Sequence, residues 1–303
     1  MKSIRAKKGC FARIVRKMTD NRAKSAVFAL FCLAACAQPV SHVPEGATVY
    51  DLRTGAELTE RKAAKADGFY GTLQRNGQAI AFVRYNPQAF QTTVVAAEGE
   101  QADSTSALCL KYDAFAGING SFFNMSELTA VTLVKDDGFI VGRNVSIDPT
   151  RANGAVIVNP EHVDFAVCDT SDTSDTFDLD WEVMASGPML FDGEQTFTYG
   201  EDREDYASFF GKRHPRSLMG KDADGGVWMV VVDGRFPGEA EGMSIDELTE
   251  LARSLGLTEA LNLDGGGSST LWVLPAGVLN HPCDNRRFDH VGQRIVPNAI
   301  VVR

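Results

Sequence analysis

The segment from residue 244 to residue 273, SIDELTELARSLGLTEALNLDGGGSSTLWV, shows how this chain alternates between helix, strand and loop. Ser244 to Leu255 is predicted to be a helix, because Ser244 and Glu247 can form a capping box and apolar residues recur on one face. Ala260 to Leu263 then predicts a short buried strand. Three consecutive glycines follow that strand directly, and a second apolar run comes after them.

Strand-like runs dominate the rest of the chain. Val227 to Val232 is continuously apolar, which predicts a central strand buried on both faces. Asp224-Gly225 before it suits a hairpin turn better than it suits a metal site with Asp222. The other predicted strands are runs of three to seven residues at 79–85, 92–96, 115–118, 131–134, 139–141, 155–158, 163–167 and 299–302, and short helices are predicted at 58–66 and 104–112.

We therefore expect an α+β fold: a single domain, residues 70–303, with a mixed β-sheet or sheets flanked by a few helices. Residues 37–69 are expected to be a tether and N-terminal extension. The 303 residues are 44% hydrophobic and 23% charged, which places the chain among globular proteins and outside the disordered and collagen-like classes. No uncharged apolar stretch reaches the ~18 residues that a membrane-spanning helix requires.

The first 36 residues read as an export signal. A basic start is followed by the uncharged run from Ser25 to Ala35, and then by Cys36. Leu33-Ala34-Ala35-Cys36 resembles a bacterial lipobox, so we expect cleavage, lipidation at Cys36 and residence on the periplasmic side of a membrane. Gln38, in place of an aspartate, favours the outer membrane. A buried amphipathic helix is the alternative, and Met1 and Met18 are both possible start residues.

The rest of the chain is strongly acidic. The whole sequence has 30 basic and 40 acidic residues, and the first 36 residues carry nine of the basic and one of the acidic ones, which leaves a net charge of −18. Such a body repels nucleic acid, so nucleic acid is excluded as a partner. An anionic substrate would need a local cluster of positive charge.

No metal site is indicated. Three scattered cysteines, Cys109, Cys168 and Cys283, follow the signal without a C-x-x-C spacing, so buried thiols are expected rather than zinc ligands. The aspartate-rich stretch 169–180 lacks the glycine and the terminal glutamate of an EF-hand and reads as a solvated loop. A need for a cofactor is left open.

The glycine loop is the first candidate site. Without side chains, the loop can expose successive backbone N–H groups as an anion-binding nest, and its hydroxyls add donors. Asp264 lies at the strand end, where a carboxylate can face a cleft. The spacing is not that of a P-loop and no lysine is present. A flexible linker is the alternative, although linkers rarely separate two apolar strands. The loop's expected substrate-binding residues are Gly265, Gly266, Gly267, Ser268 and Ser269.

Two further strand ends carry polar residues. Asn119-Gly120-Ser121 follows an apolar run, so Asn119 and Ser121 either line a site or form an ordinary turn, with the next two phenylalanines in the core. Arg216 and Arg235 are candidates for bidentate binding of a phosphate or carboxylate, with surface ion pairs as the alternative. His214 could be a general acid or base, or a structural histidine.

Together these pieces resemble the phosphodiester glycosidase family, over roughly residues 75–303. The pieces that carry the resemblance, in chain order, are NGSFF at 119–123, SGPML at 186–190 with Asp192-Gly193, PRS at 215–217 with Gly220, VDGR at 232–235, NLDGGGSS at 262–269, and Arg294 to Asn298. Ser217 stands where the family often has threonine.

The resemblance implies hydrolysis of a glycan or glycopolymer sugar-1-phosphodiester to sugar and phosphomonoester. Asp264 and Asp233 would then act as nucleophile, general base or electrostatic stabiliser of the developing oxocarbenium ion. Asn119, Ser121, Ser269 and Asn298 would orient hydroxyl or phosphate oxygens, with Ser217 beside them. The alternatives are a non-catalytic envelope lipoprotein that binds glycan fragments, and a metal-dependent phosphodiesterase, against which the scarcity of His–Asp clusters argues.

Overall fold

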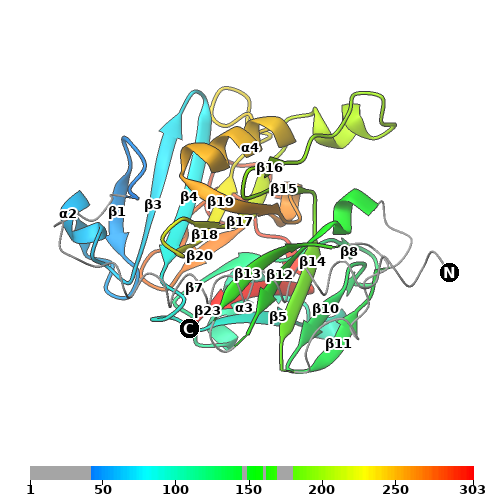
Figure 1. Cartoon of the computed structure of the whole chain (residues 1–303), viewed down its shortest axis with the longest axis horizontal. Helices are drawn as coiled ribbons and strands as arrows, with labels where there is room; N and C mark the ends of the chain where they lie inside the picture. The colour runs from blue at the N-terminus through cyan, green and yellow to red at the C-terminus, as the bar shows by residue number, and fades with distance from the viewer. Residues whose placement is uncertain (1–41, 145–148, 160–161, 169–179) are drawn as a thin grey trace.

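The protein is built in layers around one large β-sheet. The structure, a computed structural model, describes residues 42–144, 149–159, 162–168 and 180–303. A nine-stranded sheet forms the middle layer, helix α4 (Ile245–Ser254) covers one face, and two five-stranded sheets lie on the other side (Figure 1). One cluster of buried apolar residues joins α4 to the large sheet, and a second joins the large sheet to the smaller ones.

The nine-stranded sheet combines strands from both ends of the sequence. Strand β4 (Gln78–Tyr85) pairs with β3 (Gly68–Arg75) and with β18 (Val227–Val232). All of β18 is buried, which confirms the predicted central strand. The order is β16-β15-β19-β17-β18-β4-β3-β1-β2, where the other strands are β1 (Thr48–Asp51), β2 (Glu57–Leu58), β15 (Met189–Asp192), β16 (Gln195–Thr196), β17 (Arg216–Asp222) and β19 (Leu257–Asn262).

The two five-stranded sheets have the orders β11-β10-β14-β12-β13 and β21-β20-β7-β23-β5. The first consists of β10 (Val134–Asp136), β11 (Phe139–Gly142), β12 (Gly154–Val158), β13 (Val163–Val167) and β14 (Glu182–Ser186). The second consists of β5 (Thr92–Ala96), β7 (Ala116–Asn119), β20 (Leu271–Val273), β21 (Gly277–Val278) and β23 (Asn298–Val302), so the last strand of the chain lies inside it. Two short pairs remain: β6 (Asp103–Ser104) with β22 (Ile295–Val296), and β8 (Phe123–Asn124) with β9 (Thr129–Ala130).

The described helices are few and short. They are α2 (Glu60–Ala63), α3 (Thr105–Lys111) and α4, with 3₁₀ turns at Gly99–Gln101, Pro149–Ala152 and Gly266–Ser268 and a π turn at Tyr206–Phe210. The capping box of α4 is confirmed, because the backbone N–H of Glu247 donates to Ser244 Oγ and the Ser244 N–H donates to Glu247 Oε2. No described helix is long and apolar enough to cross a bilayer.

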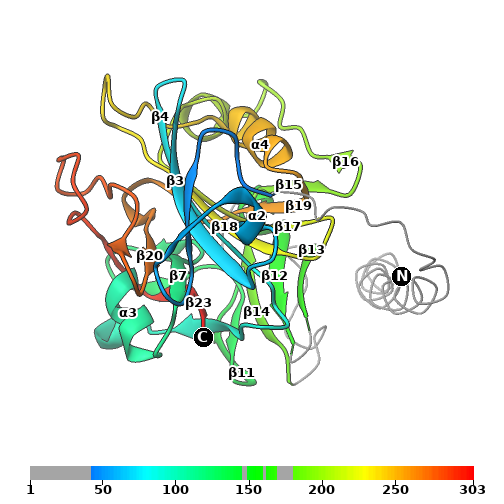
Figure 2. The ribbon, with the colours of Figure 1, turned by 90° about the vertical axis from the view of Figure 1, so that its left-hand side faces the viewer.

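The α+β expectation needs one correction. Every strand pair in the described part of the chain is antiparallel, whereas the sequence analysis expected a mixed sheet. Parallel neighbours need long crossover connections, usually helical, and the three described α-helices have only 4, 7 and 10 residues. The protein is therefore strand-dominated, with few helices (Figure 2).

Strands β1 and β2 lie within residues 37–69, the predicted tether and extension. Both are hydrogen-bonded into the large sheet, β1 against β3 and β2 against β1. The predicted signal segment, Cys36, Gln38 and both possible start residues lie outside the described residues, as does most of the aspartate-rich stretch. The prediction of buried thiols is confirmed, because Cys109, Cys168 and Cys283 are all buried and free.

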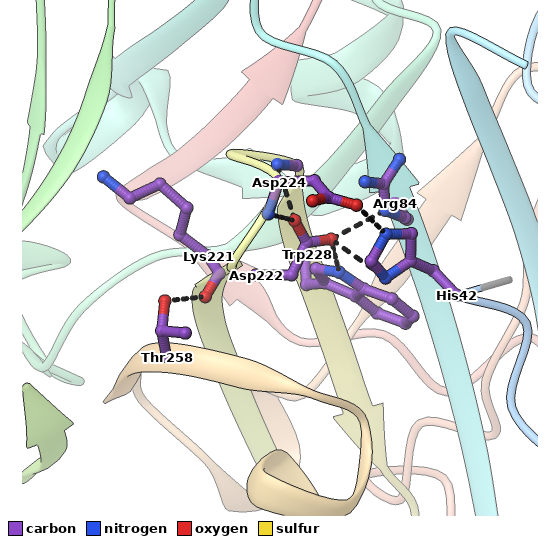
Figure 3. A network of polar contacts seen from close by, with 8 residues as sticks. His42, Arg84, Lys221, Asp222, Asp224, Trp228 and Thr258 are labelled. Carbon is purple, nitrogen blue, oxygen red and sulfur yellow. Dashed lines mark hydrogen bonds and ion pairs between the residues drawn. The ribbon is translucent and has the colours of Figure 1, made fainter. Parts of the chain in front are cut away.

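The hairpin between β17 and β18 is organised by one buried carboxylate. Asp222 Oδ1 accepts from the backbone N–H groups of Asp224 and Gly226, which confirms the predicted turn. Asp222 Oδ2 accepts from Arg84 Nε at 2.7 Å and from Trp228 Nε1 at 2.9 Å (Figure 3). His42 reaches the same place, with Nε2 2.7 Å from Asp224 Oδ2, so this hairpin also holds the first described residue.

Candidate active site

The glycine loop leaves β19 and turns back on itself before β20. Gly266 has a φ of +63°, a conformation that favours glycine. Most of the loop's backbone N–H groups are used inside the protein: Gly266 N donates to Pro215 O, and the N–H groups of Ser268 and Ser269 donate to carbonyls within the loop. Among the described contacts, only Gly267 N lacks a partner. The expected open nest is thus reduced to one free amide, and positive charge must come from side chains.

Asn119 fastens this loop to the neighbouring sheets. Its Nδ2 donates to the carbonyl of Asp264 at 2.7 Å, and its Oδ1 accepts from Ser217 Oγ at 2.7 Å and from Thr270 N at 3.1 Å. The side chain is fully buried. The arrangement brings Asn119, Ser217 and the loop together, as expected, and its direct effect is to hold Asp264 in place.

Ser121 and Asn298 form the next set of contacts around the site. Ser121 N donates to Asn298 Oδ1 at 2.7 Å, and Ser121 Oγ donates to Ala185 O at 2.6 Å. Asn298 Nδ2 and the hydroxyls of Ser269 and Thr270 are buried without a protein partner in the described structure. Each unpaired buried polar group costs roughly 1–3 kcal/mol. A bound water or ligand at these atoms would remove that cost.

Arg216 is a buried cation without a counter-ion. It is 1% exposed, and it forms no ion pair with any described residue. Its Nε donates to Met243 O at 2.9 Å and its Nη2 to the carbonyls of Phe209 and Lys212. Burial, with the charges of Arg151 and Arg235, lowers the pKa of Arg216 to about 9, which still leaves it cationic at neutral pH. A buried charge of this kind favours a nearby anion.

Arg235 is exposed and lies against the glycine loop. A Cβ added to Gly266 would be 3.0 Å from Arg235 Nη2. Arg235 itself has a φ of +67°, an uncommon conformation for a residue with a side chain. Strain of this kind clusters at functional sites.

His214 is held between two groups. Arg235 Nη2 lies 3.4 Å from its Nδ1, and Ser208 O lies 2.9 Å from its Nε2. The arginine can only donate, so Nδ1 accepts and Nε2 carries the proton. Burial lowers the pKa of His214 and the neighbouring cations lower it further, so the ring is neutral at pH 7. Its role in proton transfer stays a prediction.

Two more arginines belong to the cluster. Arg151, half-buried, lies over the rings of Phe209 at 4.5 Å and Phe122 at 5.5 Å. Arg294 pairs with Asp284 through two hydrogen bonds of 2.7 and 2.9 Å and lies beside Gly267. Arg151 stands in none of the sequence motifs, and Arg294 stands out in the sequence only as the start of the closing piece of the resemblance.

Asp264 is the carboxylate that the glycine loop itself contributes to these cations, in addition to Asp284, which pairs with Arg294. Burial raises the pKa of its side chain to about 6, although Ser268, Arg294, the Gly265 N–H and Arg151 all act to lower it. The Gly265 N–H donates to Asp264 Oδ1 at 2.9 Å. Near neutral pH the group is mostly ionised but can accept a proton readily. Such a group can act as a general base or stabilise a developing positive charge.

Asp233 faces elsewhere. Its Oδ1 accepts from Asn280 Nδ2 at 3.0 Å and from His281 N at 2.9 Å, and its Oδ2 lies 2.7 Å from His281 Nδ1. These contacts occupy a carboxylate that is 2% exposed. None of them involves Asp264 or the arginines. The structure therefore joins Asp264, Arg216, Arg235 and Asn119 in one place and puts Asp233 beside His281.

The comparison with known families rests on the same segments. Residues 112–303 match the family model described as phosphodiester glycosidase. The chain belongs to the phosphodiester glycosidase family. All four arginines of the cluster, Asn119 and the glycine loop lie within this phosphodiester glycosidase segment.

Individual relatives of this phosphodiester glycosidase chain are distant. A mouse N-acetylglucosamine-1-phosphodiester alpha-N-acetylglucosaminidase is 24% identical over 173 residues, which are 55% of this chain and 33% of the mouse protein, so the chain spans a third of that relative. The catalytic domain of the zebrafish enzyme of the same name, auto-inhibited by its pro-peptide, has a TM-score of 0.59 at 13% identity and covers 88% of this chain and 91% of that one. A hypothetical protein from Synechocystis gives 0.51 at 15% identity, over 78% and 62% of the two chains. These structures share the fold.

Proposed function

We propose that this chain is a hydrolase that cleaves the glycosidic bond of a sugar-1-phosphodiester. Water adds to the anomeric carbon, the bond from that carbon to the phosphate oxygen breaks, and the water proton leaves with the site's base. The products are the free sugar and a phosphomonoester. The observation that carries the proposal is the convergence of Arg216, Arg235, Arg151 and Arg294 around Asp264 in an otherwise acidic protein.

Each part of this cluster fits one need of the reaction. A phosphodiester is anionic, and the exposed guanidinium of Arg235 can bind it bidentately while buried Arg216 adds a fixed positive potential. Phosphate is a good leaving group, so strong acid catalysis is less necessary. The positive charge that develops on the sugar calls for a carboxylate. We assign that role to Asp264, and Asn119 positions it through the Asp264 carbonyl.

We further propose that the enzyme is exported and anchored to a bacterial membrane by a lipid on Cys36, on the periplasmic side of the outer membrane. The basic, apolar and small residues of 1–36 support this. Its substrate would then be a glycan or glycopolymer phosphodiester of the cell envelope. Mass spectrometry of the protein from membranes tests the lipid at Cys36.

The catalytic proposal is tested on a panel of sugar-1-phosphodiesters. Asp264→Asn should lower kcat by about 10²-fold or more, as removal of a catalytic carboxylate does. Arg235→Gln should mainly raise KM, by about tenfold, because it removes a charged hydrogen bond to the substrate. Arg61→Gln is the matched control, since Arg61 is an exposed arginine at the end of α2.

Hydrolysis in ¹⁸O-labelled water separates this proposal from the alternatives. Label in the released sugar supports cleavage at the anomeric carbon, and label in the phosphate would mean attack at phosphorus. Full turnover in a folded Asp264→Asn protein would refute the assignment of the site. Tight binding of glycan diesters without any product would favour a non-catalytic binding protein.

A further inference from the structure

A cavity lies near the glycine loop and contains none of its residues. It has a volume of about 620 Å³ and lies between β1, β3 and β4 on one side and the segment 276–290 on the other. The volume falls in the usual range of small-molecule sites, roughly 300–1,000 Å³. The turn between β1 and β2 borders it through Gly55, where an added Cβ would lie 2.9 Å from Pro275. Nothing in the proposed catalytic cluster uses this space.

One wall of the cavity carries an oriented histidine. Asp233 Oδ2 lies 2.7 Å from His281 Nδ1, and a carboxylate oxygen can only accept, so Nδ1 carries the proton. In the neutral ring, His281 Nε2 is then the nitrogen with the lone pair, and no described protein group hydrogen-bonds to it. The ring is held further by Phe288, whose centroid is 3.7 Å away in a stacked arrangement. Asp233 is thus a positioning residue for His281.

A second histidine repeats the arrangement. The Nδ1 of His290 lies 2.8 Å from the carbonyl oxygen of Asn280, which again fixes the proton on Nδ1. The His281 and His290 rings lie 4.4 Å apart. Both line the cavity, and both keep Nε2 free of protein partners in the described structure. Two fixed acceptors of this kind suit neighbouring hydroxyl groups.

The opposite wall is aromatic and uncharged. Tyr50 and Tyr70 line the cavity with their rings stacked at 5.5 Å. None of the lining residues is a lysine or arginine, and the only carboxylate, Asp233, is occupied by its three hydrogen bonds. Such a cavity does not attract a phosphate, in contrast to the arginine cluster. It suits a neutral ligand with an apolar face for the tyrosines and hydroxyls for the histidines, which is the chemistry of a sugar ring.

We propose that this cavity binds an uncharged sugar ring, with Tyr50 and Tyr70 against its C–H face and the Nε2 atoms of His281 and His290 accepting from its hydroxyls. The cavity shares a wall with the glycine loop, since Asn280 Nδ2 donates both to Asp233 Oδ1 and to Ser269 O. The site is nevertheless chemically distinct from the anion-binding cluster, and its occupancy does not require hydrolysis.

The test is a titration of the ¹⁵N-labelled full chain with methyl glycosides of glucose, galactose, N-acetylglucosamine and N-acetylgalactosamine. We expect about millimolar binding of at least one glycoside. The side-chain ¹⁵N signals of His281 and His290 should shift, and those of His162, which precedes β13 and lines a different cavity, should not. Tyr50→Ala and His290→Gln should each weaken binding by about tenfold, and His162→Gln should leave it unchanged.

Other outcomes overturn the proposal. Binding that both cavity variants leave intact would place the sugar elsewhere. The absence of any shift at His281 and His290 up to tens of millimolar glycoside would show that the cavity does not bind sugars. Shifts caused by inorganic phosphate would make it an anion site, and loss of both histidine signals on adding Ni²⁺, without any response to glycosides, would make it a cation site. The readout is the binding of glycosides. The sugar-site proposal can therefore fail while the catalytic variants behave as proposed, and the catalytic proposal can fail while glycosides still bind.

Discussion

Replacing Asp222 by asparagine should be the most destabilising conservative change in the β17–β18 hairpin. The Asp222 side chain is fully buried and accepts from Arg84, Trp228 and two backbone N–H groups at 2.7 to 3.0 Å. Asparagine keeps the shape and one carbonyl oxygen, but it leaves the Arg84 guanidinium, 11% exposed, without its counter-charge. Loss of one partner of a buried ion pair typically costs about 3–5 kcal/mol, so we expect a loss of about 3 kcal/mol in the free energy of unfolding.

Asp224→Asn is the matched control, because the two residues stand in the same turn. The Asp224 side chain is 60% exposed and, among the described residues, has only His42 as a polar partner, so its loss should cost less than about 1 kcal/mol of folding free energy. Urea unfolding followed by tryptophan fluorescence measures both variants, and Trp228 reports directly on the hairpin. A loss below about 1 kcal/mol for Asp222→Asn, or equal losses in the two variants, would refute the reasoning.

The pH dependence gives a second check on Asp222. Burial raises the pKa of this carboxyl, but the hydrogen bonds from Arg84 and Trp228 outweigh it, so the pKa of Asp222 is lowered in the folded protein. A lowered pKa stabilises the fold above the unfolded value of about 4, and that stability is lost as the pH falls through the folded value. The difference between wild type and Asp222→Asn should therefore shrink in acid.

Three further outcomes are expected. Burial raises the pKa of Asp264 to about 6, so diester cleavage should increase as the pH rises through about 6, and a pH–rate profile that is flat there would argue against its action as a carboxylate. Burial raises the pKa of Glu182 from 4.5 to about 7, so stability should fall as the pH rises between these values, and Glu182→Gln should abolish that slope in thermal unfolding. Gly266→Ala should lower the free energy of unfolding by about 1–2 kcal/mol and should also lower activity, because its Cβ would meet Arg235. Gly238→Ala, at a φ of +82° with open space around it, should lower the free energy of unfolding without lowering activity.

Local sequence signals predicted the elements whose causes are local. The capping box and apolar stripe located α4, and the unbroken apolar run located β18. Strand direction was not predictable in this way, because it depends on which strands meet: β4 pairs with β18, more than 140 residues later. Strands β1 and β2, before residue 70, were not predicted because apolar and polar side chains alternate poorly along them. Pairing with β3 is what holds β1 as a strand.

The same limit applies to the site. Glycines and polar residues at strand ends indicated where Asn119, Arg216, Arg235 and the loop lie. No sequence pattern marks Arg151, because it is a lone arginine in a turn. Only the fold brings it next to the ring of Phe209 and the cation of Arg216. The pairing of Asp233 with His281 joins residues 48 positions apart and was equally invisible in the sequence.

The inner position of β23 has a consequence for biosynthesis. Since β23 lies between β7 and β5, that sheet cannot close until β23 itself has been made. Until then both neighbours expose unpaired edges, which are prone to pair with other chains. Folding of this sheet must therefore wait until residues 298–302 are available to pair with both neighbours. A chain truncated before β23 should aggregate instead of forming a slightly smaller domain.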